Sequence, residues 1–342
     1  MYCRPAASIV RLFALLLVST TLFAEGRPEK VTTGPGAPQH ALSQPTGFAA
    51  TPSQAETPLL VSRWACLLQA DATKSIPANR YDTVVIDYSR DGTEQGRYSA
   101  TDLANIRALG VRNILSYLSI GEAESYRYYF NQSWVDSKGG QTDSAPAWLG
   151  RLNPDWPGNY KVQYWSEEWQ QIIVGYLGHI LDAGFDGVYL DIVDAFEYWA
   201  TPGNGERFTV DEKDAAAYMM HFIARLAAHA RRRNPDFHIV IQNAERILDF
   251  DTNGEFLRTI DGIGVEDLYY NGRVPESAEW TSARRRELDR FVAAGKPVMV
   301  IDYVYAGTPT DSRVRSFIAR ATADHYVPYP AWSDRKLDRV SR

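Results

Sequence analysis

Four acidic residues stand at the ends of short apolar runs that have the length of a β-strand. Asp87 ends the run VVID, Asp191 ends GVYLD, Glu266 ends GIGVE and Asp302 ends VMVID. A carboxylate beside an apolar run is partly desolvated, and an unpaired charge there is costly. One acid in such a position commonly caps the next helix, but four that follow the same pattern indicate a shared acidic site. Two carboxyl groups placed close together can hydrolyse a glycosidic bond without a metal ion.

Further polar and aromatic side chains follow the same or neighbouring runs. Glu122 and Glu124 lie in SIGEAE, and Gln242, Asn243 and Glu245 lie in IQNAE. The aromatic residues near the run ends are Tyr88, Tyr117, Trp165, Tyr189, Tyr269, Tyr270, Tyr303 and Tyr305. Aromatic rings either fill a core or present a flat face to a ligand such as a sugar. Carboxylates, aromatic rings and no cofactor motif together favour glycoside hydrolysis.

Two other functions are compatible with the same acids. Asp87, Asp191 and Asp302 could supply the oxygen ligands of a divalent metal such as Mg²⁺. No histidine accompanies these acids, which disfavours this interpretation. Alternatively, the acids could only accept hydrogen bonds from sugar hydroxyls in a carbohydrate-binding protein without catalysis.

The elements that position these residues alternate regularly. Strand-length runs, several rich in β-branched residues, alternate with amphipathic segments of helix length. The predicted strands are Val84–Tyr88, Asn113–Leu118, Lys161–Trp165, Gly187–Ile192, His238–Gln242, Gly262–Glu266, Pro297–Tyr303 and Tyr326–Trp332. The predicted helices are Ala100–Leu109, a segment after the N-cap Ser166 that ends before Gly184, Asp211–Arg232, Ile247–Ile260, Ala278–Ala294 and Asp311–Ala323. Eight strands in this alternation predict an α/β fold, a parallel (β/α)₈ TIM-type barrel, in which functional residues gather at the C-terminal ends of the strands.

Composition excludes several classes of protein. The 342 residues carry 36 Lys plus Arg against 42 Asp plus Glu, so the net charge is 36 − 42 = −6, which gives no basic surface for nucleic acid. The segment SRDGTEQG lacks the glycine patterns that bind nucleotides. Cys3 and Cys66 are the two cysteines, and Cys66, in the apolar stretch WACLL, is expected to be a buried and unreactive thiol. We expect no metal site, no other cofactor and a monomer.

The N-terminal residues have the order of a secretory signal peptide. Arg4 and Arg11 precede the apolar run LFALLLV, and small residues follow, so residues 1–24 are expected to be cleaved after Ala24. Residues 25–58, rich in Pro, Gly, Ser and Thr, are expected to form a disordered leader before the domain at 59–335. The predicted location is secreted or periplasmic, without membrane association after signal cleavage.

Several segments resemble glycoside hydrolase family 114, the endo-α-1,4-polygalactosaminidase group. They are VVIDYSRDG, ILSYLSIGEAESYRYYF, YKVQYWSEEW, GFDGVYLDIVDAFEYW, QNAE, GIGVEDLYYNG and VMVIDYVY, which run in order from about Val84 to Tyr305. The pair formed by SIGEAE and GVYLD is the most specific part of this resemblance. The resemblance implies a TIM-type barrel that cleaves α-1,4-linked galactosamine-containing polysaccharide inside the polysaccharide chain, with retention of configuration and without a cofactor.

The resemblance also implies a catalytic pair. By motif position, Asp191 in DGVYLD would be the nucleophile, and Glu266 in GVED would be the acid and base. Fungal members often have Asn-Glu-Gln-Cys at the sixth strand where this chain has VEDL, so the assignment of Glu266 rests on strand position, and Glu245 is the competing acid. Asp194 is expected to cap or orient. The candidate substrate-binding residues are Asp87, Tyr117, Glu122, Tyr189, Gln242, Asn243, Tyr269, Asp302 and Tyr303. An acidic site would attract the protonated amine of a partly deacetylated amino sugar.

Overall fold

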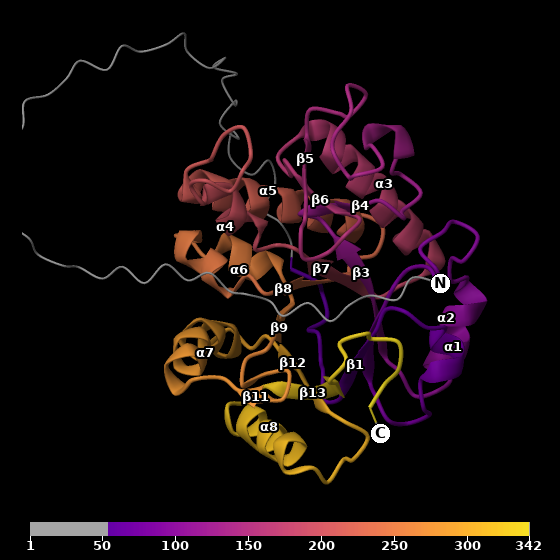
Figure 1. Ribbon diagram of the computed structural model, residues 1–342. Helices are drawn as coiled ribbons and strands as arrows, with labels where there is room; N and C mark the ends of the chain where they lie inside the picture. Colours follow the sequence, from indigo (N-terminus) through magenta and orange to yellow (C-terminus); the bar gives the residue numbers. More distant parts are fainter. Residues whose placement is uncertain (1–53, 342) are drawn as a thin grey trace, which may run out of the picture. The chain divides into compact units, whose positions relative to one another are not determined.

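The computed structural model describes residues 54–341 (Figure 1). The expected signal peptide at residues 1–24 and the expected leader up to residue 53 lie outside the described residues. The described residues all belong to one compact unit.

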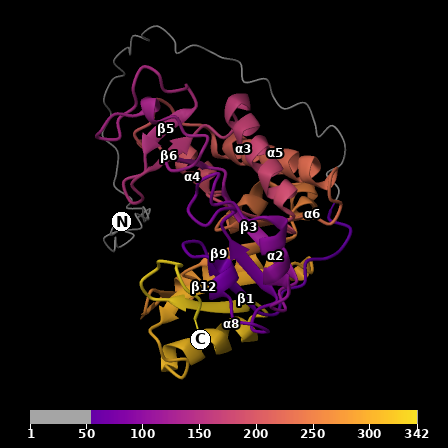
Figure 2. The same cartoon turned by 90° about the vertical axis from the view of Figure 1, so that its right-hand side faces the viewer.

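Eight parallel strands form one sheet that curves into a nearly closed barrel, with helices on its outside (Figures 1 and 2). The strands are β1 (Trp64–Leu67), β2 (Thr83–Ile86), β3 (Asn113–Ser119), β7 (Gly187–Asp191), β8 (His238–Gln242), β9 (Gly262–Glu266), β12 (Val298–Tyr305) and β13 (Val327–Trp332). Their order in the sheet is their order in the chain. The predicted (β/α)₈ barrel is confirmed.

Aromatic side chains fill the barrel and join its two edge strands. The Trp64 indole N–H on β1 donates to the carbonyl oxygen of Val327 on β13 at 2.9 Å. The Trp64 ring lies 5.6 Å from the Tyr329 ring and 6.2 Å from the Tyr189 ring. Because β1 and β7 are not neighbours in the sheet, a contact between their side chains must cross the barrel interior. The interior is therefore a packed core and not a pore.

The helices on the outside follow the sequence signals for helix ends. They are α1 (Ala72–Ser75), α2 (Ala100–Arg107), α3 (Glu167–Ala183), α4 (Ala195–Ala200), α5 (Glu212–Arg231), α6 (Glu255–Thr259), α7 (Ala278–Ala293) and α8 (Ser312–Ala323), with 3₁₀ turns η1 (Gln132–Trp134) and η2 (Glu245–Phe250). Ser99 and Asp102 form a reciprocal capping box at the start of α2. Gly184 ends α3 in the left-handed conformation, with φ of 89°.

One predicted helix is interrupted. The segment predicted as a helix over Ile247–Ile260 consists of η2 and the short helix α6. Between them, the Asp251 carboxylate accepts hydrogen bonds from the backbone N–H groups of Phe256 and Leu257. An acid that binds backbone N–H groups in this way starts a new helix and ends the old one.

The prediction of the third barrel strand was wrong. Part of the segment Lys161–Trp165 lies in β6 (Asn159–Val162), which pairs antiparallel with β4 (Glu122–Glu124) and β5 (Leu149–Leu152) in a separate three-stranded sheet. In the barrel, β3 pairs directly with β7. The strand that the sequence analysis missed is β1, which contains Cys66. The two errors cancel in the count, so Asp191 and Glu266 still end the fourth and sixth barrel strands.

Outside the barrel, a short hairpin joins β10 (Tyr270–Asn271) and β11 (Val274–Pro275). Across residues 54–341, no helix has the length and apolar character needed to cross a membrane.

Candidate active site

Three consecutive barrel strands end in residues with an uncommon backbone conformation. Ile192, Asn243 and Asp267 directly follow β7, β8 and β9, and their φ angles are 58°, 57° and 51°. A positive φ is a marked outlier for a β-branched residue such as isoleucine. Strained backbone of this kind persists where the surrounding structure fixes it, and it gathers at functional sites. The strand ends that carry Asp191 and Glu266 are therefore held in a defined geometry.

Asp191, the last residue of β7, has a carboxylate with two protein donors. The Tyr117 hydroxyl on β3 donates to its Oδ2 at 2.7 Å, and the Ile192 backbone N–H donates to its Oδ1 at 2.8 Å. Both donors stabilise the charged form of the carboxylate. Tyr117, a predicted binding residue, thus contacts the predicted nucleophile directly.

Glu266, the last residue of β9, also has two donors. The Tyr303 hydroxyl donates to its Oε1, and the Asn243 side-chain amide donates to its Oε2 at 3.3 Å. Asn243 is tied to the same residue a second time, because its Oδ1 accepts from the Glu266 backbone N–H at 2.9 Å. The structure therefore brings Asn243 and Tyr303, two predicted substrate-binding residues, together around Glu266.

The two carboxyl groups influence each other electrostatically. Burial, followed by the charge of Glu266, raises the pKa of Asp191 to about 7, although the Tyr117 hydrogen bond opposes this shift. Burial raises the pKa of Glu266 above its usual value, and the negative charge of Asp267 adds to this effect. Cys66 on β1 lies near both acids, since their charges add to the effect of burial in raising the pKa of its thiol. Burial and the negative charge of Glu266 thus oppose the ionisation of Asp191.

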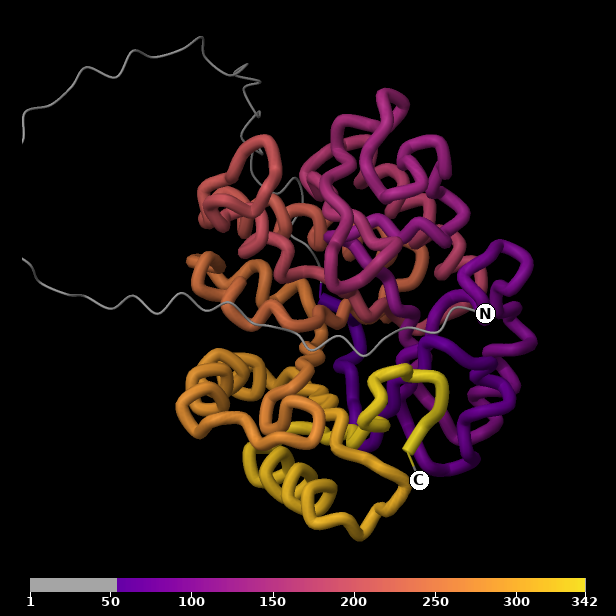
Figure 3. The backbone as a smooth tube through the Cα atoms, in the orientation of Figure 1, coloured from indigo at the N-terminus to yellow at the C-terminus, as the bar shows by residue number. Residues whose placement is uncertain are grey.

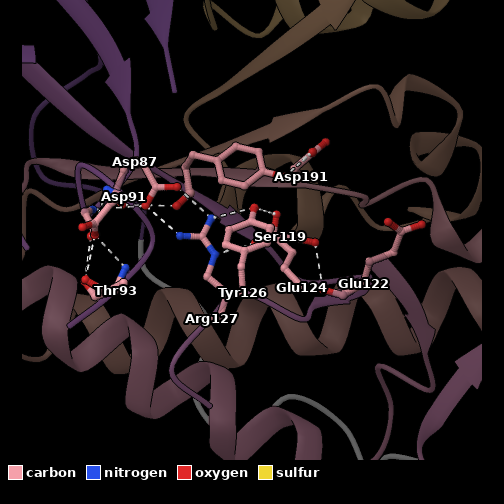
Figure 4. A network of polar contacts seen from close by, with 12 residues as sticks. Asp87, Asp91, Thr93, Ser119, Glu122, Glu124, Tyr126, Arg127 and Asp191 are labelled. Atoms are coloured by element: carbon pink, nitrogen blue, oxygen red, sulfur yellow. Dashed lines mark hydrogen bonds and ion pairs between the residues drawn. The ribbon is translucent and has the colours of Figure 1, made fainter. Parts of the chain in front are cut away.

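Asp87 belongs to a buried ionic network beside this pair (Figure 4). Figure 4 shows Asp87 and Glu124 on either side of the Arg127 guanidinium. Arg127 donates from Nη1 to Asp87 Oδ1 at 2.8 Å, its Nη2 lies 2.8 Å from Asp87 Oδ2, and its Nε donates to Glu124 Oε2 at 2.7 Å. The Tyr126 ring lies against the guanidinium, 4.8 Å from its carbon, and the Tyr126 hydroxyl donates to Glu124. Asp87 is therefore neutralised by an arginine.

Glu122 faces away from this network and is fully buried. Its carboxylate pairs with the Lys161 ammonium and accepts from the side-chain amides of Asn153 at 2.8 Å and Asn159 at 3.3 Å. These partners lie on or beside β5 and β6. Glu122 therefore ties the three-stranded sheet together.

Three other predicted binding residues lie in the core. Tyr189 packs inside the barrel against Trp64. The Tyr269 hydroxyl points to α8, where it donates to Asp324 at 2.7 Å. Asp302 is fully buried and accepts hydrogen bonds from the backbone N–H groups of Leu268, Tyr269 and Tyr270 at 2.9 to 3.0 Å. Asp302 thus fixes the loop that follows Glu266.

These placements bear on the possible metal site. The oxygens of Asp87 are bound by Arg127, and those of Asp302 by backbone N–H groups. Within residues 54–341, no group of three or more His, Cys, Asp or Glu side chains is arranged to hold a metal ion.

Gln242, the remaining predicted binding residue, is almost fully buried at the end of β8.

The strand pattern did not predict the structural roles of three residues near the site. Arg127 bridges two acids, and its position just after GEAE in the sequence could have suggested an ion pair. Arg335 follows the last strand and reaches Asp267, beside Glu266. Asp194 occupies the N-cap position of α4, but its side chain makes no capping hydrogen bond. Burial and the charge of Asp191 raise the pKa of Asp194 to about 8.

Relatives of the chain exist in several prokaryotes. An uncharacterized protein of Methanocaldococcus jannaschii is 42% identical over 282 residues, which cover 81% of this chain and 78% of the relative. An uncharacterized protein of Thermotoga maritima is 37% identical over 281 residues, which cover 81% of this chain and 83% of the relative. An uncharacterized protein of Deinococcus radiodurans is 33% identical over 341 residues, 96% of this chain and 97% of the relative.

Two solved structures share the fold. Aspergillus fumigatus Ega3, solved as a complex with galactosamine, matches 82% of this chain and 96% of its own with a TM-score of 0.59 and 20% identity. The glycoside hydrolase domain of PelA from Pseudomonas aeruginosa matches 82% of this chain and 97% of its own with a TM-score of 0.58 and 15% identity. The sequence model of glycoside-hydrolase family GH114 matches residues 45–342. Because this family model matches most of the chain, the chain belongs to glycoside-hydrolase family GH114.

Proposed function

We propose that this glycoside hydrolase cleaves α-1,4-linked galactosamine-containing polysaccharide, inside the chain and with retention of configuration. The observation that supports this proposal best is the pair of strand-end carboxyl groups, Asp191 and Glu266, each held by two protein donors and each with a raised pKa. Retaining glycosidases use two such groups, one ionised as the nucleophile and one protonated as the acid. Their separation in a retaining enzyme is about 5–5.5 Å.

In the proposed mechanism, Asp191 and Glu266 act in two steps. The Asp191 carboxylate attacks the anomeric carbon, the bond to the leaving oxygen breaks, and Glu266 transfers its proton to that oxygen. Glu266, now ionised, then removes a proton from water, the water oxygen attacks the anomeric carbon, and the bond to Asp191 breaks. The donors from Tyr117 and Ile192 suit the ionised form of Asp191.

The surroundings of Glu245 favour Glu266 as the acid and base. Glu245 is buried and paired with the Arg284 guanidinium, which stabilises the ionised form of its carboxylate. Arg284 also donates to the backbone carbonyl oxygen of Glu266 at 2.7 Å. Glu245 therefore suits a supporting role behind Glu266, since a general acid must carry a proton.

The charge of the site supports a cationic substrate. Asp191, Asp194 and Glu266 all have raised pKa values, because burial and repulsion from neighbouring carboxylates oppose their ionisation. A protonated amine bound among them would relieve this repulsion. Ega3, which has the same fold, was solved as a complex with galactosamine. We therefore infer that a partly deacetylated amino sugar binds near Asp194.

Export completes the proposal. The order of charged, apolar and small residues in the first 24 positions supports a cleaved signal peptide and a secreted or periplasmic location. N-terminal sequencing of the mature protein should begin at Glu25.

Release of reducing ends from partly deacetylated galactosaminogalactan tests the activity. Wild type should release them in the presence of a chelator. The Glu266→Gln variant should be slower by about 10²–10⁴-fold, the usual contribution of a general acid. The Glu245→Gln variant serves as the matched comparison. If the Glu266→Gln variant keeps wild-type activity and the Glu245→Gln variant loses it, the assignment of the acid is wrong. No release by folded wild type would reject the proposed substrate.

A further inference from the structure

The C-terminal segment 333–341 lies against the strand ends at the seam of the barrel. The Ser333 backbone N–H donates to the carbonyl oxygen of Tyr305 at 2.9 Å. The Leu337 carbonyl oxygen accepts from the N–H groups of Leu68 at 2.9 Å and Gln69 at 3.1 Å, just after β1. Figure 3 shows this yellow segment beside the indigo start of the described chain. The segment therefore bridges the C-terminal ends of β12 and β1, at the end of the barrel that carries the site.

Arg335 is the residue of this segment that reaches the active site. Its Nη2 group donates to both carboxylate oxygens of Asp267, at 2.7 and 2.9 Å, and to Asn271 Oδ1 at 3.0 Å. The guanidinium carbon lies 4.2 Å from the centre of the Tyr303 ring. The φ angle of Arg335 is 57°, in the left-handed region that residues other than glycine seldom adopt.

The groups that Arg335 contacts are those that flank Glu266. Tyr303 donates its hydroxyl to Glu266 Oε1. Asp267 is the next residue in the chain, and its buried charge raises the pKa of Glu266. Arg335 thus stacks on Tyr303, which donates a hydrogen bond to Glu266. It also neutralises the charge of Asp267, the residue that follows Glu266 in the chain.

We propose that Arg335, alone among the residues of the C-terminal segment 333–341, is a positioning residue for Glu266. Arg335 does this by fixing the Tyr303 ring and the Asp267 carboxylate on two sides of Glu266. The proposal rests on the proposed function, in which Glu266 is the acid and base.

The electrostatic consequence has a definite sign. The titratable and charged groups that face Glu266 are Asp267, Tyr303, Arg335, Asp191, Cys66 and Tyr189, with Arg284 at its backbone. Among them, the positive charge of Arg335 lowers the pKa of Glu266. Removal of the Arg335 charge therefore raises the pKa of Glu266 directly. It also leaves the charge of Asp267 without a neutralising cation, and this second effect raises the pKa of Glu266 as well. Since the first step needs protonated Glu266, the alkaline limb of the pH profile should move to higher pH.

The test compares full-length Arg335→Gln, Arg335→Lys and Arg339→Gln variants with wild type on galactosaminogalactan. For the Arg335→Gln variant, kcat should fall by about 10–10²-fold, the effect expected when a reacting group is misplaced by about 1 Å. KM should stay close to wild type, and the alkaline limb of kcat should move to higher pH. The Arg335→Lys variant keeps the charge but not the planar fork, so it should restore the position of the limb and only part of kcat.

The Arg339→Gln variant is the matched control. Arg339 lies in the same segment, stacks on Trp332 at 4.1 Å and pairs with the half-exposed Asp334 and Asp338. Its replacement should leave kcat and the pH profile at wild-type values.

The outcomes separate this proposal from the proposed function. Wild type without hydrolysis would reject the function itself, and full activity after Glu266→Gln would reject Glu266 as the acid and base, on which the role of Arg335 rests. With that function confirmed, an unchanged kcat and alkaline limb in Arg335→Gln would overturn the role of Arg335. If Arg335→Gln does not fold, Arg335→Lys decides, because a purely structural role predicts wild-type kcat in a folded variant. A loss of thermal stability with an unchanged pH profile would also overturn the proposal.

Discussion

At the scale of single residues, hydrogen-bond donors from neighbouring strands fix the positions of the Asp191 and Glu266 carboxyl groups. Asp191 accepts from a tyrosine and a backbone N–H, and Glu266 accepts from a tyrosine and an asparagine amide. The Asp191→Asn variant should lose hydrolysis to the background of the assay, because an amide cannot attack the anomeric carbon, while its circular dichroism and Tm stay close to wild type. Asp182→Asn, on the exposed face of α3, is the control and should be fully active. Activity retained by Asp191→Asn would remove Asp191 from the nucleophile role.

The hydroxyl of Tyr117 gives a second prediction at this scale. It donates to Asp191 and lowers the pKa of that carboxyl. Without it, the pKa of Asp191 should rise further, so less of the ionised nucleophile exists at a given acidic pH. The acid limb of kcat/KM in the Tyr117→Phe variant should therefore move to higher pH. Tyr326→Phe, whose hydroxyl donates to Asp289 at 2.8 Å on α7, should leave the limb in place. If the acid limb is unchanged in Tyr117→Phe, the titration of a group other than Asp191 sets this limb.

At the scale of elements, the packing inside the barrel depends on Gly264, which has no side chain. A Cβ atom on Gly264 of β9 would clash with the Tyr189 hydroxyl oxygen, so Gly264→Ala forces the Tyr189 ring to move. Overpacking of this kind costs typically about 1–3 kcal/mol. Gly175→Ala in α3 is the opposite case, because nothing lies within 4 Å of its added Cβ. It should stabilise the protein by roughly 0.5–1 kcal/mol. Urea unfolding measures both changes, and a Gly264→Ala variant as stable as wild type would contradict this packing.

The elements also show how far the sequence was predictive. Seven barrel strands were predicted, because a buried parallel strand is an apolar run between turn signals. The run KVQYW has the same local pattern but pairs in a different sheet, and nothing within five residues can indicate its partner. The strand β1, WACL, was missed because it contains no β-branched residue, whereas β2, TVVI, has the same length and consists of them.

The site residues show the same difference between local patterns, which are predictable, and contacts between distant residues, which are not. Asp191, Glu266 and Tyr303 were expected from strand ends. The contacts of Arg335 with Asp267 join residues 68 positions apart, so only the closed barrel brings them together.

At the scale of the whole molecule, acidic groups at the site should make stability depend on pH. The pKa of Asp194 is raised from 3.8 to about 8 in the folded protein, so the folded state binds this proton more tightly than the unfolded state. Its contribution to stability is therefore present at low pH and is lost as pH rises from about 4 toward 8. The amide of the Asp194→Asn variant does not titrate, so the unfolding free energy of this variant relative to wild type should be higher at pH 8 than at pH 5.

Asp182→Asn is the control for this comparison. The pKa of Asp182 is lowered by its hydrogen bond with Arg233, so Asp182 is ionised in both states above pH 5. Its relative stability should be the same at pH 5 and pH 8. A relative stability of Asp194→Asn that does not change between the two pH values would show that Asp194 is solvated in the folded protein.

The most direct test of a catalytic pair formed by Asp191 and Glu266 is peptide mass spectrometry of the Glu266→Gln variant after reaction with an activated galactosaminyl fluoride. The fluoride leaves without an acid, and the loss of the general base slows hydrolysis of the intermediate, so the glycosyl-enzyme should accumulate. We expect one added sugar on the peptide that contains Asp191, and none in the Asp191→Asn, Glu266→Gln double variant. A sugar attached to a different residue, or turnover without any covalent adduct, would contradict this catalytic pair.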